Sequence, residues 1–122
     1  MTDYEILDFV ADEHNCSLTE EDNNILEIEG YSSEGRNWTI EIEADEIDNS
    51  LKEQADIYDV NYETYIWLDN FGNGGHGAPH DIEDILNDSK EIKQTIEDIY
   101  RDYSLIKRCD ASVNFLQKNV KD

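Results

Sequence analysis

The sequence predicts an α+β fold, in which an antiparallel β-hairpin or small sheet packs against four to five helices, the last of them long. Two segments between residues 25 and 44 alternate apolar and acidic residues, as a half-buried strand does, and the segments around them repeat apolar residues with helical spacing. The 122 residues contain no internal repeat and no Pro/Ser-rich linker. We therefore expect one domain, residues 1–122, with its own hydrophobic core.

The first expected helix covers residues 2–15. It opens on the pattern Thr2-x-x-Glu5, a capping box in which two side chains satisfy free amides at a helix start. Apolar residues then recur at helical spacing, namely Tyr4, Leu7, Val10 and Ala11. This spacing predicts an amphipathic helix with an acidic outer side.

A β-hairpin is predicted from residues 25–31 and 37–44, joined by a turn at residues 32–36 that contains Gly35. The inward residues would be Leu26, Ile28, Trp38, Ile40 and Ile42. Because side chains on a strand alternate between two faces, the glutamates between them would share the opposite face. These are Glu27, Glu29, Glu41 and Glu43.

Two helices are expected after the hairpin. Asp45 would cap the first, whose inward residues are Ile47, Leu51, Ala55 and Tyr58. Asn61 would cap the second, over residues 62–71. Its inward side would be formed by Tyr62, Tyr65 and Ile66, with Trp67 and Leu68 as further candidates.

The glycine-rich residues 72–80 are predicted to form a loop, and Pro79 would open a short helix that ends at Leu86. Asp88 or Ser89 would then begin the longest helix. Along it, five large residues step alternately by four and three positions, which is typical of a helix-packing surface. We call this set the isoleucine stripe: Ile92, Ile96, Ile99, Tyr103 and Ile106.

The chain is strongly acidic, with 31 Asp and Glu against nine Lys and Arg, a formal net charge of -22. Residues 1–89 hold 25 acidic and two basic residues, a net charge of -23, whereas residues 90–122 hold six acidic and seven basic residues, a net charge of +1. Direct binding to nucleic acid or to an anionic membrane needs a positive surface, so we expect neither.

The two cysteines, Cys16 and Cys109, lie far apart in the sequence. No signal peptide precedes them, and no apolar run approaches the ~20 residues of a membrane span. These features predict a cytoplasmic protein with two free thiols, although the sequence leaves a bridge between them open.

Neither a cofactor nor an enzyme activity is expected from the sequence. His76 and His80 are weak candidates for a divalent metal such as Zn²⁺, but Gly77 and Pro79 stand between them and break helical spacing. His14 and Cys16 are close in sequence at a helix end, without the loop that would stabilise an oxyanion.

The candidate partner-binding surface is made of acidic residues of the hairpin and its flanks. They are Glu27, Glu29, Glu41 and Glu43 on the hairpin, Asp45, Glu46 and Asp48 after it, and Glu20, Glu21 and Asp22 before it. Residues two apart on a strand are ~6.6 Å apart, and each DNA strand presents a phosphate every ~3.4 Å of helix axis. Rows of carboxylates can therefore approximate a track of phosphates.

A resemblance covers roughly residues 55–103, on the segments ADIYDVNYETYIWLD and GAPHDIEDILNDSKEIKQTIEDIY. There the chain resembles small acidic proteins of uncharacterised function from phages and mobile elements of low-GC Gram-positive bacteria. The matching residues are Asp59 or Asn61, Glu63, Trp67, Gly77, Pro79 and Ile92. In size, acidity and AT-rich character, the chain is also similar to anti-CRISPR and antirestriction proteins, which often act as DNA mimics.

Charge and resemblance together predict a non-catalytic inhibitor of a bacterial defence nuclease, of the anti-CRISPR type. It would act as an acidic DNA mimic that occupies the basic DNA-binding groove of an RNA-guided nuclease. The alternative is an acidic interaction or adaptor module that forms a homodimer through the isoleucine stripe. A third hypothesis is a small metal-binding protein that binds the metal through His76 and His80.

Overall fold

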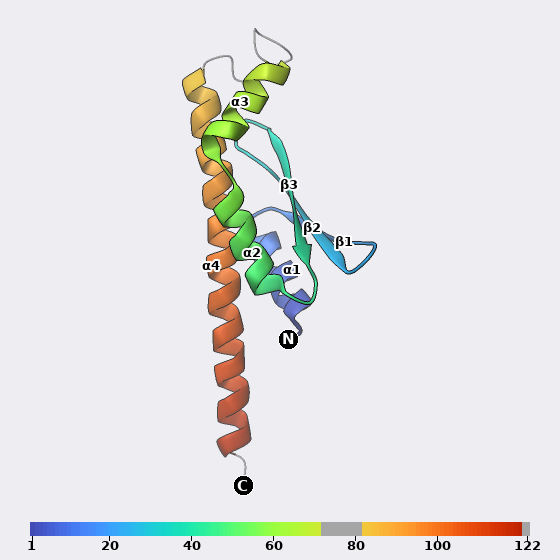
Figure 1. Ribbon diagram of the computed structural model, residues 1–122. Coiled ribbons are helices and arrows are strands. Elements are labelled where there is room, and N and C mark those ends of the chain that lie inside the picture. The colour runs from blue at the N-terminus through green and yellow to red at the C-terminus, as the bar shows by residue number, and fades with distance from the viewer. Residues whose placement is uncertain (72–81, 121–122) are drawn as a thin grey trace.

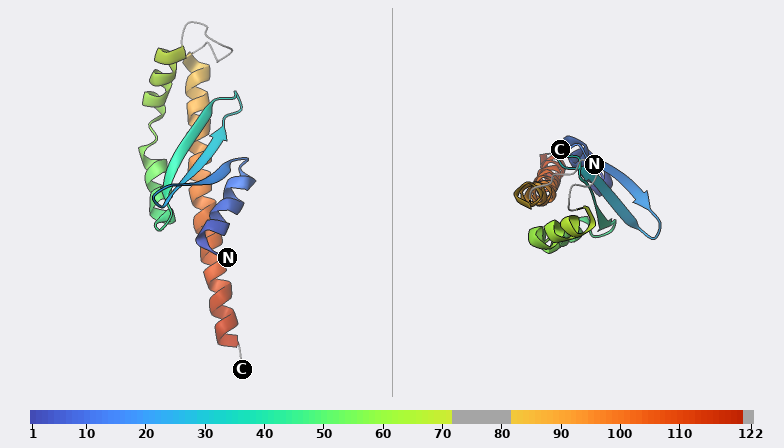
Figure 2. Two further views of the ribbon diagram at one scale, coloured as in Figure 1. Left: turned by 90° about the vertical axis from the view of Figure 1, so that its right-hand side faces the viewer. Right: turned by 90° about the horizontal axis from the view of Figure 1, so that it is seen from above.

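Four helices lie on one side of a three-stranded antiparallel sheet with strand order β1-β2-β3 (Figures 1 and 2). A computed structural model describes the backbone of residues 1–71 and 82–120, and the side chains of residues 1–69 and 82–110. In chain order the elements are α1 (Asp3–Glu13), β1 (Ser17–Glu21), β2 (Ile25–Tyr31), β3 (Asn37–Glu43), α2 (Ile47–Ile57), α3 (Val60–Phe71) and α4 (Ile82–Val120). The predicted α+β class and the long C-terminal helix are confirmed.

The capping box at the start of α1 is present. The Glu5 amide donates to Thr2 Oγ1 at 3.1 Å, and the Thr2 amide donates to Glu5 Oε1 at 2.7 Å. The helix buries Leu7, Val10 and Ala11 as expected, together with Ile6. Both local hydrogen bonding and apolar spacing therefore favour this helix.

The predicted hairpin is the β2–β3 pair, and its inward residues are buried. Its turn also follows the prediction, since Gly35 adopts φ +87 and the Ser32 amide donates to the Arg36 carbonyl at 2.9 Å. β1 is absent from the predicted elements because its sequence, SLTEE, offers a single apolar side chain, Leu18, opposite Ile28. Pairing with β2, rather than its own pattern, makes this segment a strand.

Gly30 of β2 is required by close packing. A Cβ atom there would lie 2.5 Å from the Trp38 ring and 2.9 Å from Cys16 Sγ. The indole of Trp38 therefore covers the backbone of β2, and no larger residue fits without displacing it.

The predicted cap of α2 by Asp45 is wrong. The helix begins at Ile47 with Glu46 in the capping position, and no side chain accepts a hydrogen bond there. The Glu46 amide donates to the Glu43 carbonyl at 3.1 Å, which forms a turn that keeps Asp45 out of the capping position. The predicted inward residues of this helix are buried or half-buried.

Three predictions for α3 are also wrong. The helix starts one residue before Asn61, and the Asp59 carboxylate accepts the Tyr62 amide at 3.0 Å. Tyr62 and Tyr65 are 61% and 66% exposed, whereas Thr64 is buried. The helix is turned this way because Thr64 finds polar partners inside the protein, and the tyrosine hydroxyls can stay in water.

The predicted break between Leu86 and Ser89 does not exist, because α4 is one helix of 39 residues from Ile82. Pro79 lies outside the described residues. Asp88 and Ser89 sit within the helix and are only 5% and 0% exposed. These residue types favour helix starts, but here their side chains lie among partners in the interior rather than capping amides.

The isoleucine stripe forms the helical side of the core. Its first four members are at most 1% exposed, and Ile106 is half-buried against the same cluster. They pack with the inner side chains of the sheet and with α1 and α2. The stripe is thus buried within this chain, whereas a homodimer formed through the stripe would require these side chains at the surface. None of the helices in the described part of the chain has the length and apolar composition to cross a membrane.

Candidate functional site

Five carboxylates point from the sheet face that is turned away from the helices. We call this set the outer face: Glu21, Glu27, Glu29, Glu41 and Glu43. Seen from above, all the helices lie on the other side of the sheet (Figure 2). Among the described elements, none covers the outer face. Glu21, Glu41 and Glu43 are exposed to water there, and Glu27 and Glu29 are half-buried between their neighbours.

Glu27 and Glu41 form the centre of the outer face, because they are paired directly across β2 and β3. Backbone hydrogen bonds at the ends of the ladder join Ser32 to Arg36 and Asn24 to Ala44. Bonded and non-bonded pairs alternate along an antiparallel ladder, which makes the central pair non-bonded, with Cα atoms ~4.5 Å apart. Two like charges thus face each other at the shortest cross-strand spacing.

More acidic residues gather at the end of the sheet where β3 leads into α2. The Ala44 amide donates to the Asn24 carbonyl at 2.9 Å, which ties the β1–β2 turn to this end. We call the resulting set the acidic end: Glu20, Asp22, Glu43, Asp45 and Glu46. The pKa of Glu43 is raised, first by a hydrogen bond with Glu46 and then by repulsion from neighbouring carboxylates. A cation brought to this end would relieve that repulsion.

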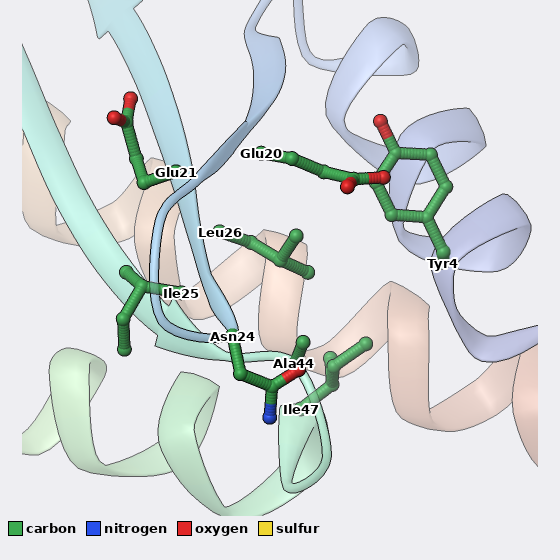
Figure 3. A pocket seen from close by; sticks show the side chains of 8 residues that line it. All are labelled: Tyr4, Glu20, Glu21, Asn24, Ile25, Leu26, Ala44 and Ile47. Atoms are coloured by element: carbon green, nitrogen blue, oxygen red, sulfur yellow. The ribbon is translucent and has the colours of Figure 1, made fainter.

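A cavity of about 410 Å³ opens at the acidic end (Figure 3). Glu20 faces the inner side of the sheet, beside Leu26, and lines this cavity with Tyr4 of α1. Ala44 and Ile47 add apolar surface. The cavity combines an apolar lining with carboxylates, which suits the aliphatic stem and charged head of a lysine or arginine.

The ten predicted residues therefore do not all share one surface. Glu20 faces the inner side of the sheet and lines the cavity. Asp48 is directed toward α4, where its Oδ1 accepts from the Ser104 hydroxyl at 2.7 Å. The remaining eight occupy the outer face and the adjoining turns.

His76 and His80 lie outside the described residues. Within residues 1–69 and 82–110, whose side chains the structure describes, no cluster of three or more His, Cys, Asp or Glu side chains could hold a metal ion.

No family model, curated protein or solved structure matches this chain. The resemblance to phage proteins and to DNA mimics stays a prediction.

A buried arginine was not among the predicted site residues. Arg36 is 7% exposed, and its guanidinium donates to Ser89 Oγ at 2.8 Å and to the Glu63 carbonyl at 3.1 Å. It also lies 3.6 Å from Glu63 Oε2 and 4.9 Å from the centre of the Trp67 ring. The sequence holds one signal for it, since Arg36 is one of two cations in residues 1–89.

Asp88 of α4 is buried and lies within electrostatic range of Arg36. Burial raises the pKa of this carboxyl, while a hydrogen bond with Ser32 and the charge of Arg36 act in the opposite direction. Its Oδ1 has no hydrogen-bond partner among the described residues. The hydrogen bond from Ser32 and the charge of Arg36 therefore offset part of the cost of burying this carboxylate.

His14 and Cys16 have structural roles. His14 Nε2 lies 2.8 Å from Asp102 Oδ2, which links the end of α1 to α4, and this hydrogen bond lowers the pKa of Asp102. Both cysteines are free, as predicted. Burial raises the pKa of Cys16 to about 11, which opposes the thiolate form that a nucleophile requires.

Relieving the central like-charge pair should stabilise the protein. Replacing Glu41 by lysine puts opposite charges at the Glu27–Glu41 position, and we expect the free energy of unfolding to rise by about 0.5–1 kcal/mol. Glu34→Lys, in the exposed β2–β3 turn, makes the same change in net charge and is the control. Urea unfolding at low and high salt measures both, and the gain should shrink as salt screens it. Equal gains at both positions would mean that net charge, not the cross-strand pair, limits stability.

Proposed function

We propose that this protein inhibits a bacterial defence nuclease by placing its outer face in the groove that normally binds DNA. The observation that supports the proposal is a set of five uncovered carboxylates on one sheet face, in a chain of net charge -22. RNA-guided nucleases are the class we favour, because they hold their heteroduplex in a positively charged channel and read a short DNA motif with arginines.

The sheet spaces its carboxylates in a manner suited to such a groove. Neighbouring strands are ~4.8 Å apart and alternate residues along a strand are ~6.6 Å apart, so the outer face is a grid of negative charges at about one and a half to two times the ~3.4 Å phosphate step. Arginine binds carboxylate and phosphate with the same two-pronged geometry. A groove lined with arginine would therefore accept either ligand.

Asp22, Asp45 and Glu46 of the acidic end extend this grid beyond the strands. Repulsion from neighbouring carboxylates, which acts after a hydrogen bond with Glu46 to raise the pKa of Glu43, is a cost of the free protein that a bound cation removes. Complementary charge also speeds encounter, so binding should be fast and should weaken as salt increases.

The test uses a purified RNA-guided nuclease loaded with its guide and a labelled duplex target. Cleavage should fall as the protein is added, and it should recover when the concentration of competing duplex or salt is raised. Capture from a bacterial lysate at low salt should enrich nucleic-acid-binding proteins. Full cleavage at every protein concentration, together with no such enrichment, would contradict the proposal.

Charge reversal on the outer face should weaken inhibition strongly. Two lost ion pairs of at least ~1.5 kcal/mol each predict a rise of about 10²-fold in the concentration needed for half-inhibition by Glu41→Lys/Glu43→Lys. The matched control is Asp8→Lys/Asp12→Lys, which changes net charge equally on the exposed side of α1. The same loss in both variants would show that total charge acts without this face.

A further inference from the structure

β3 is the last strand of the sheet, and part of its backbone faces away from β2. The ladder alternation derived above directs the amides and carbonyls of Trp38, Ile40 and Ile42 toward β2. Those of Asn37, Thr39 and Glu41 are consequently directed to the open edge. In the portion of the chain that the structure describes, the Thr39 and Glu41 amides have no hydrogen-bond partner.

One end of this edge is already closed by α2. The Glu43 amide, which the same alternation directs outward, donates to Ser50 Oγ at 3.1 Å. This contact supports the assigned direction of the edge amides. It also limits the open stretch to about five residues, 37–41.

A groove of about 250 Å³ runs beside the open stretch, between residues 36–40 and the facing side chains of α2 and α3. Both helices lie along this side of the sheet (Figures 1 and 2). Ile57 is 61% exposed there, and the half-buried Tyr58 and the amide of Gln54 complete that wall. The groove thus offers apolar contact for side chains on one side of an added strand.

The charge around this edge selects its occupant. Three carboxylates surround the open stretch. Glu41 is part of it, Glu53 of α2 lies close enough to repel Glu43, and Glu63 of α3 lines the groove. The groove also contains Arg36, but its guanidinium is engaged by Glu63 and by the Trp67 ring. A second copy of a chain with net charge -22 would be repelled, whereas a basic segment would be attracted.

We propose that the open edge of β3 binds an extended, positively charged segment of a partner protein as a fourth strand. Backbone hydrogen bonds to Asn37, Thr39 and Glu41 supply the pairing. Alternate side chains of the segment lie beside the outer face, where lysine or arginine meets Glu41, and the others enter the groove over Ile57. The preferred sequence therefore alternates basic and apolar residues. This site requires backbone pairing, which the occupation of a DNA groove by carboxylates does not.

The probe is a fluorescently labelled heptapeptide of alternating lysine and valine, and binding is followed by anisotropy. Two control peptides separate backbone pairing from simple charge attraction. One carries N-methyl groups on all of its internal backbone amides, which removes the donors in either strand direction without changing charge, and the other replaces lysine by glutamate. We expect binding of the first peptide to be at least tenfold tighter than that of either control.

Thr39→Pro tests the edge from the protein side. Proline removes an amide that β2 does not use, so the sheet should survive, and peptide affinity should fall at least tenfold. Thr39→Val keeps the amide and is the matched control. In the unaltered protein, hydrogen exchange at the Thr39 and Glu41 amides should slow at least tenfold when the peptide is added. This measurement does not depend on whether the proline variant folds.

Equal binding of the N-methylated peptide, unprotected Thr39 and Glu41 amides, or no binding of the lysine–valine peptide would each overturn the proposal. The experiment contains no nuclease, so its outcome is separate from that of the inhibition assay. A protein that pairs with the peptide but inhibits no nuclease would keep the edge site and lose the proposed function.

Discussion

Replacing Arg36 by methionine should lower the free energy of unfolding by about 3–5 kcal/mol, because it removes two hydrogen bonds from a buried charged donor, each contributing ~1.5–3 kcal/mol. The guanidinium is 7% exposed and holds Ser89, the Glu63 carbonyl and the Trp67 ring in place. Without it, Asp88 keeps a buried carboxyl whose Oδ1 has no partner among the described residues. Urea unfolding followed by circular dichroism measures the loss.

Arg101→Met is the matched control for the Arg36 substitution. Its side chain is 65% exposed and contacts Asp98 at 3.0 Å on the surface of α4, so its removal should cost less than ~1 kcal/mol. Adding Asp88→Asn to the Arg36 variant removes the uncompensated carboxylate and should restore part of the lost stability. Similar losses for the two arginine variants would contradict the role assigned to burial.

Ile96→Ala should cost about 2–5 kcal/mol of unfolding free energy, since it deletes buried methyl groups and leaves a cavity in a close-packed core. Ile96 is 0% exposed and is the second member of the isoleucine stripe. Ile96→Val removes a single methylene group and should cost about 0.5–1.5 kcal/mol. The graded pair distinguishes packing from a general effect of substitution on the helix.

Ile82 provides the matched position on the same helix. It is 61% exposed in the first turn of α4, so Ile82→Ala should change stability by less than ~0.5 kcal/mol. Thermal and urea unfolding of the three variants give the comparison. A small loss for Ile96→Ala would mean that α4 is not the helical half of the core.

The fold class and most of the core could be predicted because they depend on local periodicity. The alternation of residues 25–44 places Ile28 and Ile42 inward, and the helical step of the isoleucine stripe does the same for Ile99. β1 could not be predicted, because a strand with one apolar residue is defined by the neighbour with which it pairs. The start of α4 was missed for a related reason, since the Ser89 hydroxyl accepts a hydrogen bond from Arg36, 53 positions away in the chain.

The sequence predicted which acidic residues belong to the candidate site better than it predicted where their side chains lie. Counting charges selects the right segment, and alternation places Glu27 and Glu41 on one face. The direction of Asp48 depends on Ser104 of a distant helix, which no local pattern reveals. The edge position of β3 could not be predicted from the sequence either. Alternation shows which residues lie on each face of a strand, but it does not show whether the strand is central or at the edge of the sheet.

The core needs α4, which follows every other described element in the chain. During synthesis at ~5–20 residues per second, the 39 residues of α4 take about 2–8 s to make, and in that interval the inner side of the sheet has no helix of the stripe against it. The nascent segment of residues 1–89 carries 25 acidic and two basic residues, so neighbouring nascent chains repel one another. The acidity thus protects the growing polypeptide from aggregation before any partner is met.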